Sequence, residues 1–522
     1  MRILLFLITF VLVFCAVTSA QEAETGPARV IGTVNRIDFT GNTALTDEQL
    51  QEAVPVKPGE LLTAGDLQRI SQAVTQAYRE RGYLAVVGEN ILEGFEQTGV
   101  LTVPIVEAKV TEVRIEGLRK TRESTLRRFL ELRPGDLYSV PALRRDARRL
   151  IALGVFEQVD ANLEAAEEPG GVIIVWMLQE REKTGYVTFR GTYSPQDKLV
   201  GSIILTQSNF RGRLEQVRLS SSIGSIEGRL SWELFYHNPL VAPRTSLSAS
   251  AFDRVRYRFS RSLVDEPDVD RYFERREGGR LLTSRRLSDV RRLDTGFRYE
   301  NVDVRNFPAD FMVPDIPPVD GRVTSISAEL VEDNRDSVIY PTTGRFHRVA
   351  LEPAYVDSDD SNWIAKWGVE WRRFIALDEP PVEPAELERE YRPRVIALRA
   401  LTGSSLGELP FFEQYFLGGI GGLRGYLEDR FWGKHVFLVT GEYRQPIGRS
   451  VTALAFVDVG DAWGSDFQFL PDAETDFRQH DSLSPRVGAG IGVRYVSDYG
   501  SLGIDFAWGE EFRTHLVLGE TF

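Results

Sequence analysis

The chain has 522 residues, of which 42% are hydrophobic, and a formal net charge of -14 at pH 7. Because one hydrophobic core rarely supports this length, we expect two to four domains. The negative charge excludes a general nucleic-acid surface, so we expect no nucleic acid among the partners. The segment from Leu118 to Gly154 contains ten Lys/Arg residues and four Asp/Glu residues. This local excess fits either acidic partners and lipid headgroups or solvated helix faces.

Residues 1–20 have the pattern of a secretory signal peptide. A short positive start precedes an apolar run from Ile3 to Val17, and small residues lead to a predicted cleavage after Ala20. The single cysteine, Cys15, lies in this segment, so the mature chain is predicted to lack thiol and metal-thiolate chemistry. The longest later apolar run, Val172 to Leu178, is far shorter than the ~20 residues of a membrane helix. Any membrane crossing would therefore use strands.

A repeat follows, which we place at residues 27–107 and 108–181. The motifs at Gly41 and Pro58 recur at Gly117 and Pro134, and both offsets are equal (117 − 41 = 76 and 134 − 58 = 76). Each copy reads strand, helix, helix, strand, strand. This order predicts two small α+β modules, each with two helices on one face of a sheet.

The predicted elements of the two copies correspond in chain order. In the first copy, a strand over 34–39 precedes a helix capped by Thr46 and a longer helix that extends through Tyr78. In the second copy, a strand over 110–115 precedes helices over 124–132 and 141–153. Apolar residues at helical spacing in both copies predict core packing and not a cofactor site.

From residue 182 to 522, segments of about ten residues alternate in polarity. Val487, Ile491 and Val493, for example, alternate with glycines and Arg494. We predict sixteen strands, which begin near Gly185, Leu199, Glu215, Glu227, Thr245, Arg275, Arg291, Val323, Gly344, Asn362, Pro393, Lys434, Val451, Ser484, Gly500 and Arg513. A soluble sandwich is the alternative. Since lipid cannot satisfy a free sheet edge, we predict an all-β transmembrane barrel of sixteen antiparallel strands.

The most distinctive stretch is LPFFEQYFLGGIGGLRGY, from Leu409 to Tyr426. It resembles the BamA/TamA superfamily of outer-membrane assembly factors and their relatives, the two-partner-secretion transporters, in which periplasmic POTRA modules precede a barrel. In that family a loop with an [IVL]-R-G-[FY] tip folds into the lumen, and Leu423-Arg424-Gly425-Tyr426 matches the tip. The resemblance implies that Arg424 pins this loop to Glu442 and Asp458.

The strand pattern supports this pairing independently. Glu442 shares its parity with Thr440 and Arg444, and Asp458 alternates with Val457, so both carboxylates are predicted to point into the lumen. An enclosed guanidinium can form charge-assisted bonds to them, whereas the alternative is a solvated arginine. Glycines let the loop approach the wall closely. The loop motif comprises Gly418, Gly419, Gly422, Leu423, Gly425 and Tyr426.

Weaker matches extend along the chain. The run 333–336 followed by 340–344 resembles a family hairpin, and 148–159 resembles a POTRA segment. The C-terminus alternates in polarity and ends on Phe522, like the strand-end signal of barrel proteins. Gly519 would weaken the last strand and help a seam with the first strand to open.

The resemblance implies a factor, not an enzyme, that folds client barrel proteins into the outer membrane through this lateral seam. The expected partners are unfolded outer-membrane proteins and outer-membrane lipid, with periplasmic chaperones or accessory lipoproteins left open. A two-partner-secretion transporter that exports a soluble exoprotein is the alternative. Two modules suit it, although the residues between Gln21 and Val30 leave no room for its plug helix. A passive porin would not need the modules.

Patterns of catalytic chemistry are weak. The run Gly403–Gly407 fits G-x-S-x-G, but that motif needs a strand, a sharp turn and a helix. The glycines of 418–425 lack phosphate-loop spacing, and the five histidines lack metal-ligand spacing. We predict no catalytic residue, no metal and no cofactor.

Overall fold

A computed structural model describes residues 30–518, except 195–197, 225–229, 258–272, 306–319, 339, 359–360, 379–391, 449, 466–480 and 498–499. The predicted signal peptide, Gly519 and Phe522 lie outside the described residues. The chain forms two compact units, residues 1–118 with 129–180, and residues 119–128 with 181–522. None of the described helices is long and apolar enough to cross a membrane.

The first module contains three-residue to eight-residue strands and three helices. They are β1 (Val30–Thr33), β2 (Arg36–Thr40), α1 (Asp47–Ala53), β3 (Leu61–Thr63), α2 (Ala64–Glu80), β4 (Ala85–Val87), α3 (Phe95–Thr98) and β5 (Val100–Glu107). Strand β5 lies between β2 and β4 and runs parallel to β2. Leu50 of α1 and Ile70 of α2 are fully buried in the core beside this sheet. The two predicted helices are therefore present, and Thr46 caps the first.

A buried carboxylate fixes the entry to α1. Glu107 accepts hydrogen bonds from the backbone N–H groups of Thr43 (2.7 Å) and Ala44 (2.8 Å) and from the Tyr78 hydroxyl (2.8 Å). Burial raises the pKa of Glu107, but these bonds to the carboxylate outweigh it, so the pKa is lowered. Burial and the neighbouring Glu107 raise the pKa of Tyr78.

The second module repeats this plan. Its elements are β6 (Lys109–Glu116), α4 (Glu123–Arg127), α5 (Val140–Ala152), β7 (Phe156–Ala165) and β8 (Gly171–Glu180). Strand β8 lies between β6 and β7 and runs parallel to β6.

One predicted helix of this module is too long. The prediction extended to Leu132, but α4 ends at Arg127. The Asp146 carboxylate accepts the N–H groups of Glu131 (2.8 Å) and Leu132 (3.1 Å), which a longer helix would have bonded internally. The segment 119–128 belongs to the second unit, where the Arg122 N–H donates to the Gly212 carbonyl (2.8 Å).

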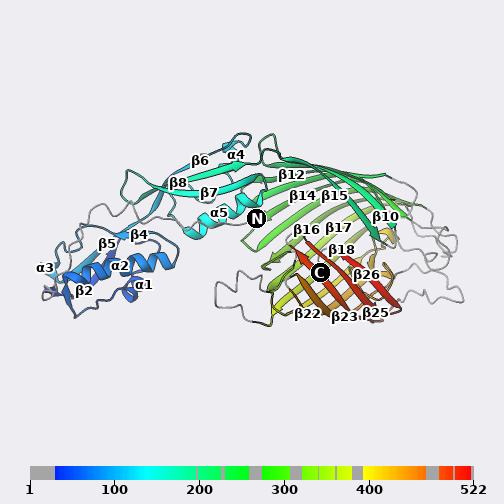
Figure 1. The fold of residues 1–522 in the computed structure, drawn as a ribbon. Helices are drawn as coiled ribbons and strands as arrows, with labels where there is room; N and C mark the ends of the chain where they lie inside the picture. Colours follow the sequence, from blue (N-terminus) through cyan, green and yellow to red (C-terminus); the bar gives the residue numbers. More distant parts are fainter. Residues whose placement is uncertain are drawn as a thin grey trace. The chain divides into compact units, whose positions relative to one another are not determined.

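Among the described residues, the second unit contains an antiparallel sheet of sixteen strands that curves into a barrel (Figure 1). The strands are β9 (Gly185–Ser194), β10 (Lys198–Phe210), β11 (Glu215–Gly224), β12 (Leu230–Ala242), β13 (Thr245–Tyr257), β14 (Phe273–Arg286), β15 (Arg291–Arg305), β16 (Gly321–Asp333), β17 (Gly344–Asp357), β18 (Asn362–Ala376), β19 (Val395–Leu406), β22 (His435–Pro446), β23 (Val451–Trp463), β24 (Arg486–Ser497), β25 (Gly500–Trp508) and β26 (Phe512–Leu518). Each predicted start lies within three residues of an observed one. The predicted fold class is confirmed.

The barrel wall has apolar residues outside and charged residues inside. On β24, Val487 and Ile491 are 53% and 55% exposed, whereas Asp458 of β23 and Asp505 of β25 are fully buried in the lumen. This distribution of apolar and charged residues is the reverse of that in a soluble protein, and a lipid environment requires it. The alternating pattern in the sequence is thus explained by an apolar outer face and a charged inner face of the wall.

Candidate functional site

The connection between β19 and β22 is a structured loop inside the barrel. It contains a short 3₁₀ helix (Phe411–Glu413) and two strands that pair with each other, β20 (Tyr415–Leu417) and β21 (Phe431–Gly433). Sequence periodicity could not reveal strands of three residues. The apolar side chains of the loop, including the fully buried Leu423, pack against Val436 and Leu438 of β22.

Arg424 lies at the tip of this loop, between the walls formed by β22, β23 and β25. Its guanidinium donates to both carboxylate oxygens of Asp458 (2.7 and 2.9 Å) and to Glu442 (2.8 Å). The Cζ atom also lies 3.4 Å from the centre of the Phe456 ring. Arg424 is 2% exposed, so the structure brings together the three residues singled out from the sequence.

A third carboxylate, which the sequence prediction missed, completes the cluster. Asp505 of β25 accepts from Arg424 (3.3 Å) and from Arg494 of β24 (2.8 Å), and Glu442 also accepts from Arg444 (3.0 Å). Three carboxylates thus face three guanidiniums among the described residues, and this balance makes burial of the charges tolerable. The sequence did contain a signal for Asp505: it is a lone acidic residue at an inward position of a strand whose outward residues are apolar.

Glycines permit the close approach of the loop to the wall. Gly418, Gly419 and Gly425 have φ angles of 142°, 73° and 90°, where other residues are strained. On the wall, a Cβ atom at Gly488 would lie 1.9 Å from the Arg424 carbonyl oxygen. Gly422 has an ordinary φ, and a Cβ there would meet Leu417 at 3.0 Å.

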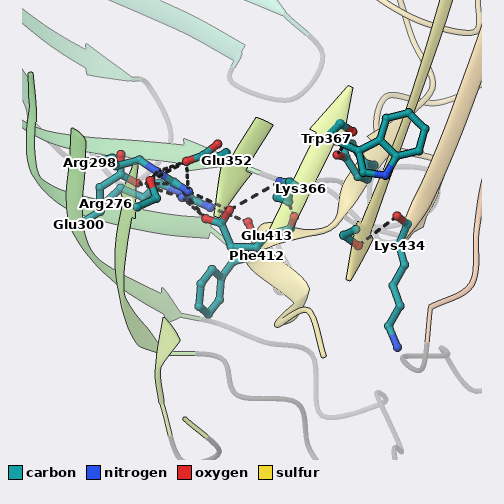
Figure 2. A network of polar contacts seen from close by, with 12 residues as sticks. Arg276, Arg298, Glu300, Glu352, Lys366, Trp367, Phe412, Glu413 and Lys434 are labelled. Carbon is teal, nitrogen blue, oxygen red and sulfur yellow. Dashed lines mark hydrogen bonds and ion pairs between the residues drawn. The ribbon is translucent and has the colours of Figure 1, made fainter. Parts of the chain in front are cut away.

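A second buried cluster holds the beginning of the loop. Figure 2 shows Glu413 among cationic side chains from β14, β15 and β18. Its carboxylate accepts two bonds from Arg298 (3.0 and 3.2 Å) and one from Arg276 (3.1 Å), while Lys366 donates to its carbonyl oxygen (2.6 Å). Arg276 also donates to the Phe412 carbonyl (2.6 Å). The sequence prediction missed Glu413, although a single acid in the aromatic run PFFEQYF was a usable signal.

The wall supplies the compensating carboxylates of this second cluster. Glu300 of β15 accepts from Arg276 (3.1 Å), and Glu352 of β17 accepts from Arg298 (2.9 Å) (Figure 2). Glu413 and Glu300 are 4% and 0% exposed, so water contributes little to their stabilisation. The position of the Glu413 side chain is therefore fixed by its ion pairs with the surrounding arginines.

The two clusters attach the loop to different parts of the wall. Strands β14 and β25 are nine positions apart in the sixteen-strand order, which places them roughly opposite each other in a closed barrel. The loop therefore crosses the lumen. A cavity of about 1210 Å³ remains beside it, lined by charged side chains that include Arg254, Arg280, Arg348 and Arg399.

The loop also contacts the last hairpin. Arg430 donates to both carboxylate oxygens of Glu510 (2.8 and 2.9 Å), and the Glu511 N–H donates to the Gly425 carbonyl (3.3 Å). The Tyr426 hydroxyl donates to the Val487 carbonyl (3.1 Å). The position of the loop is thus linked to the turn between β25 and β26.

The remaining sequence motifs have structural positions. Ser405, the serine of the G-x-S-x-G pattern, lies within β19 and donates to the Lys434 carbonyl (3.1 Å), so its strand does not turn into a helix there. Asp336 accepts the N–H groups of Thr342 (2.9 Å) and Thr343 (3.2 Å) and so shapes the turn between β16 and β17. Within the described ranges, no cluster of three potential metal ligands is found.

Comparison with known proteins relates this architecture to others. The chain matches the Omp85 superfamily domain over residues 209–522 and POTRA, the surface antigen variable number repeat, over residues 32–107 and 108–181. The outer membrane protein assembly factor BamA of Nitratidesulfovibrio vulgaris is 23% identical over 516 residues, 93% of this chain and 59% of that protein. Outer envelope protein 80 of Arabidopsis thaliana is 23% identical over 492 residues, 87% of this chain and 63% of that protein. The chain thus spans less than two thirds of either relative.

Solved structures share the fold. BamA from Haemophilus ducreyi lacking POTRA domains 1–3 gives a TM-score of 0.59 at 19% identity, and the match covers 94% of this chain and 98% of that one. CdiB from Escherichia coli gives a TM-score of 0.60 at 17% identity, covering 97% and 92%.

Proposed function

The chain belongs to the Omp85 superfamily, and we propose that it folds client β-barrel proteins into the outer membrane through the junction between β9 and β26. The barrel lies in the outer membrane, and the POTRA modules lie in the periplasm. The proposal involves no catalytic residue and no cofactor, because burial of the client's apolar face drives insertion.

The observation that carries this proposal is the position of β9 and β26, which are the two end strands of the sheet. Each pairs with one neighbour, β10 and β25 respectively, and no pair among the described strands joins β9 to β26. Each backbone hydrogen bond contributes about 1 kcal/mol net, so two edges with few such bonds between them part more readily than strands joined by a full ladder. An opened edge offers its backbone to a client strand, which then leaves sideways into lipid.

The modules would deliver the client. Strands β2 and β4 form the edges of the first sheet, and β6 and β7 form the edges of the second. An edge strand can pair with an extended client through backbone bonds, which tolerate many client sequences. Unfolded outer-membrane proteins are therefore the proposed clients.

The loop would control the junction. We propose that Arg424, with Glu442 and Asp458, pins the loop tip, and that the pinned loop steadies the last hairpin through Arg430 and Glu510. The glycines of the loop motif serve the same role by allowing close packing. Opening of the junction then requires the hairpin to part from the loop.

A second function, export of a soluble exoprotein, is favoured by one observation. The two-module architecture superimposes on CdiB over 97% of this chain. A transporter of this kind would use the lumen as its path, and the loop would have to leave the lumen.

Reconstitution separates the two functions. Purified full-length protein in liposomes is mixed with a urea-unfolded eight-stranded barrel client, and folding is followed by the heat-resistant gel mobility of the client. An insertion factor increases the folding rate relative to protein-free liposomes. Unchanged client folding, together with ion conductance and tight binding of one extended exoprotein, would establish the transporter instead.

A further inference from the structure

The lipid-facing surface of β14–β18 carries a cluster of arginines, which we call the basic rim, at the end of the barrel where β14, β16 and β18 finish. Strand β9 begins directly after the periplasmic modules and successive strands alternate in direction, so this end is periplasmic. The rim contains four arginines and one glutamate, a net charge of +3 (4 − 1). Its members are Arg285, Arg291, Glu332, Arg345 and Arg373.

Strand parity places these side chains outside the barrel. On β18, Arg373 alternates in phase with Trp367 and Trp371, which are 41% and 36% exposed. On β17, Arg345 alternates in phase with the exposed Val349, and its Cα atom is the register partner of Arg373. The two guanidiniums therefore project from the same height of the wall.

Ion pairs order part of the rim in advance. Glu332 pairs with Arg291 (2.6 Å) and with Arg345 (2.6 Å), and these two arginine side chains remain 58% and 43% exposed. One carboxylate thus holds two arginine side chains that remain partly exposed. Arg285 and Arg373 are also exposed.

The rim lies at the depth of the lipid headgroups. Trp363, at the opposite end of β18, is 72% exposed and packs on Tyr355, as aromatic residues do at a membrane interface. Arg373 follows ten residues later (373 − 363 = 10), which is roughly 33 Å of strand. At a tilt of 35–45° this spans roughly 25 Å, the height of the apolar band of such barrels. Arg373 then reaches the periplasmic headgroups.

The charge is specific to this place on the wall. At the opposite end of the same strands, outward charges of both signs nearly cancel: among the residues whose side chains the structure describes they sum to −1 (2 − 3), from Arg275, Glu277, Asp303, Arg322 and Asp357. Near the junction, the outward positions at the periplasmic end are uncharged on β22, β23 and β24, where Tyr443, Val451 and Tyr495 lie. Strand β17 is seven positions from β26 in the sixteen-strand order, so the rim lies roughly opposite the junction.

We propose that the basic rim binds the phosphates of anionic phospholipids in the periplasmic leaflet. Exposed guanidiniums at headgroup depth match a phosphate in charge and in hydrogen-bonding geometry. Bound headgroups hold the wall opposite the junction at a fixed depth while the junction moves. The site operates whether the barrel inserts or exports clients, so its test is separate from theirs.

The test compares lipid association of the full-length protein in phosphatidylcholine bilayers, by electron spin resonance of spin-labelled phosphatidylglycerol and phosphatidylcholine. The native protein prefers phosphatidylglycerol at low salt. The double variant Arg345→Gln/Arg373→Gln loses this preference, by up to about fivefold for each arginine. The matched control, Arg275→Gln/Arg322→Gln, removes the same charge from the other end and retains the preference.

Heat-resistant gel mobility establishes that both variants are folded before lipids are compared. An unchanged preference in the rim variant overturns the proposal, as does an equal loss in the control. The proposal is also overturned if the rim variant keeps its lipid preference but no longer binds a protein that the native protein binds. The rim would then be a protein contact.

Discussion

Gly488 of β24 lies directly against the backbone of Arg424, and a Cβ atom at this glycine would be 1.9 Å from the Arg424 carbonyl oxygen. The substitution Gly488→Ala therefore displaces the loop tip without removing any charge. Overpacking of this kind costs about 1–3 kcal/mol. We expect faster proteolysis within residues 409–431 and slower client folding in the liposome assay. The substitution Arg424→Ala should have the same two effects, because it leaves the carboxylates around Arg424 uncompensated.

Gly201 of β10 provides the matched control, because nothing lies within 4 Å of a Cβ atom there. Gly201→Ala should leave both the protease pattern and client folding unchanged. If Gly488→Ala also behaves like the native protein in both measurements, close contact between loop and wall is not needed.

Glu413→Gln tests the second cluster. The variant keeps the size of the side chain but leaves Arg276, Arg298 and Lys366 without the central carboxylate. Breaking a buried ion pair costs about 3–5 kcal/mol. We expect amide exchange to accelerate in residues 409–417, read by mass spectrometry, with less change at the Arg424 tip. Glu277→Gln is the control, because the Glu277 side chain is 47% exposed and lies on the outer face, and equal effects of the two substitutions would contradict the assignment.

The contact between Arg430 and Glu510 links the loop to the last hairpin. Because the Glu510 side chain is 38% exposed, Glu510→Gln should change the free energy of unfolding by about 1 kcal/mol or less. It should nevertheless accelerate amide exchange in residues 509–513, since one of the contacts holding this turn is lost. Native exchange rates in the variant would show that the loop does not steady the hairpin.

Glu107 gives a pH-dependent prediction for the first module. Its pKa in the folded state is lowered, so its contribution to stability is present above the unfolded pKa of about 4.3 and is lost as pH falls through the folded pKa. Glu107→Gln should destabilise the module by about 1–3 kcal/mol at pH 7.

Amide exchange of residues 43–54 in the full-length protein measures this effect. The difference between the native protein and the variant should shrink at acid pH, below the folded pKa. A difference that stays constant from pH 7 downward would exclude the Glu107 carboxylate as its source.

The sequence predicted the barrel well because a membrane wall imposes alternation on every strand. Val487 and Ile491 had to be apolar on the lipid side, and turn residues separate the segments. The same rule predicted the inward direction of Glu442 and Asp458, whereas their partner Arg424 came from the loop motif. In these strands, the residues that alternate in polarity along the sequence are the residues that alternate between lipid and the barrel interior.

Other features depended on contacts that no local pattern contains. The end of α4 is determined by Asp146, fifteen residues further along the chain than Glu131. Asp505 and Glu413 join their clusters only because the sheet closes around the loop, across 81 and 115 residues of sequence from Arg424 and Arg298, respectively. Contacts that form when the sheet curves around the loop, and not local helix or strand propensity, bring these residues into their clusters.

The central claim, that clients leave through the junction of β9 and β26, is tested by locking that junction. The predicted mature chain contains no cysteine, so paired cysteines scanned between Val187 or Phe189 and Thr514 or Leu516, whose side chains share the outward face of the wall, would form a defined disulfide. In the liposome assay, the oxidised pair should abolish the acceleration of client folding, and reduction should restore it. Full acceleration with the junction crosslinked would contradict the account.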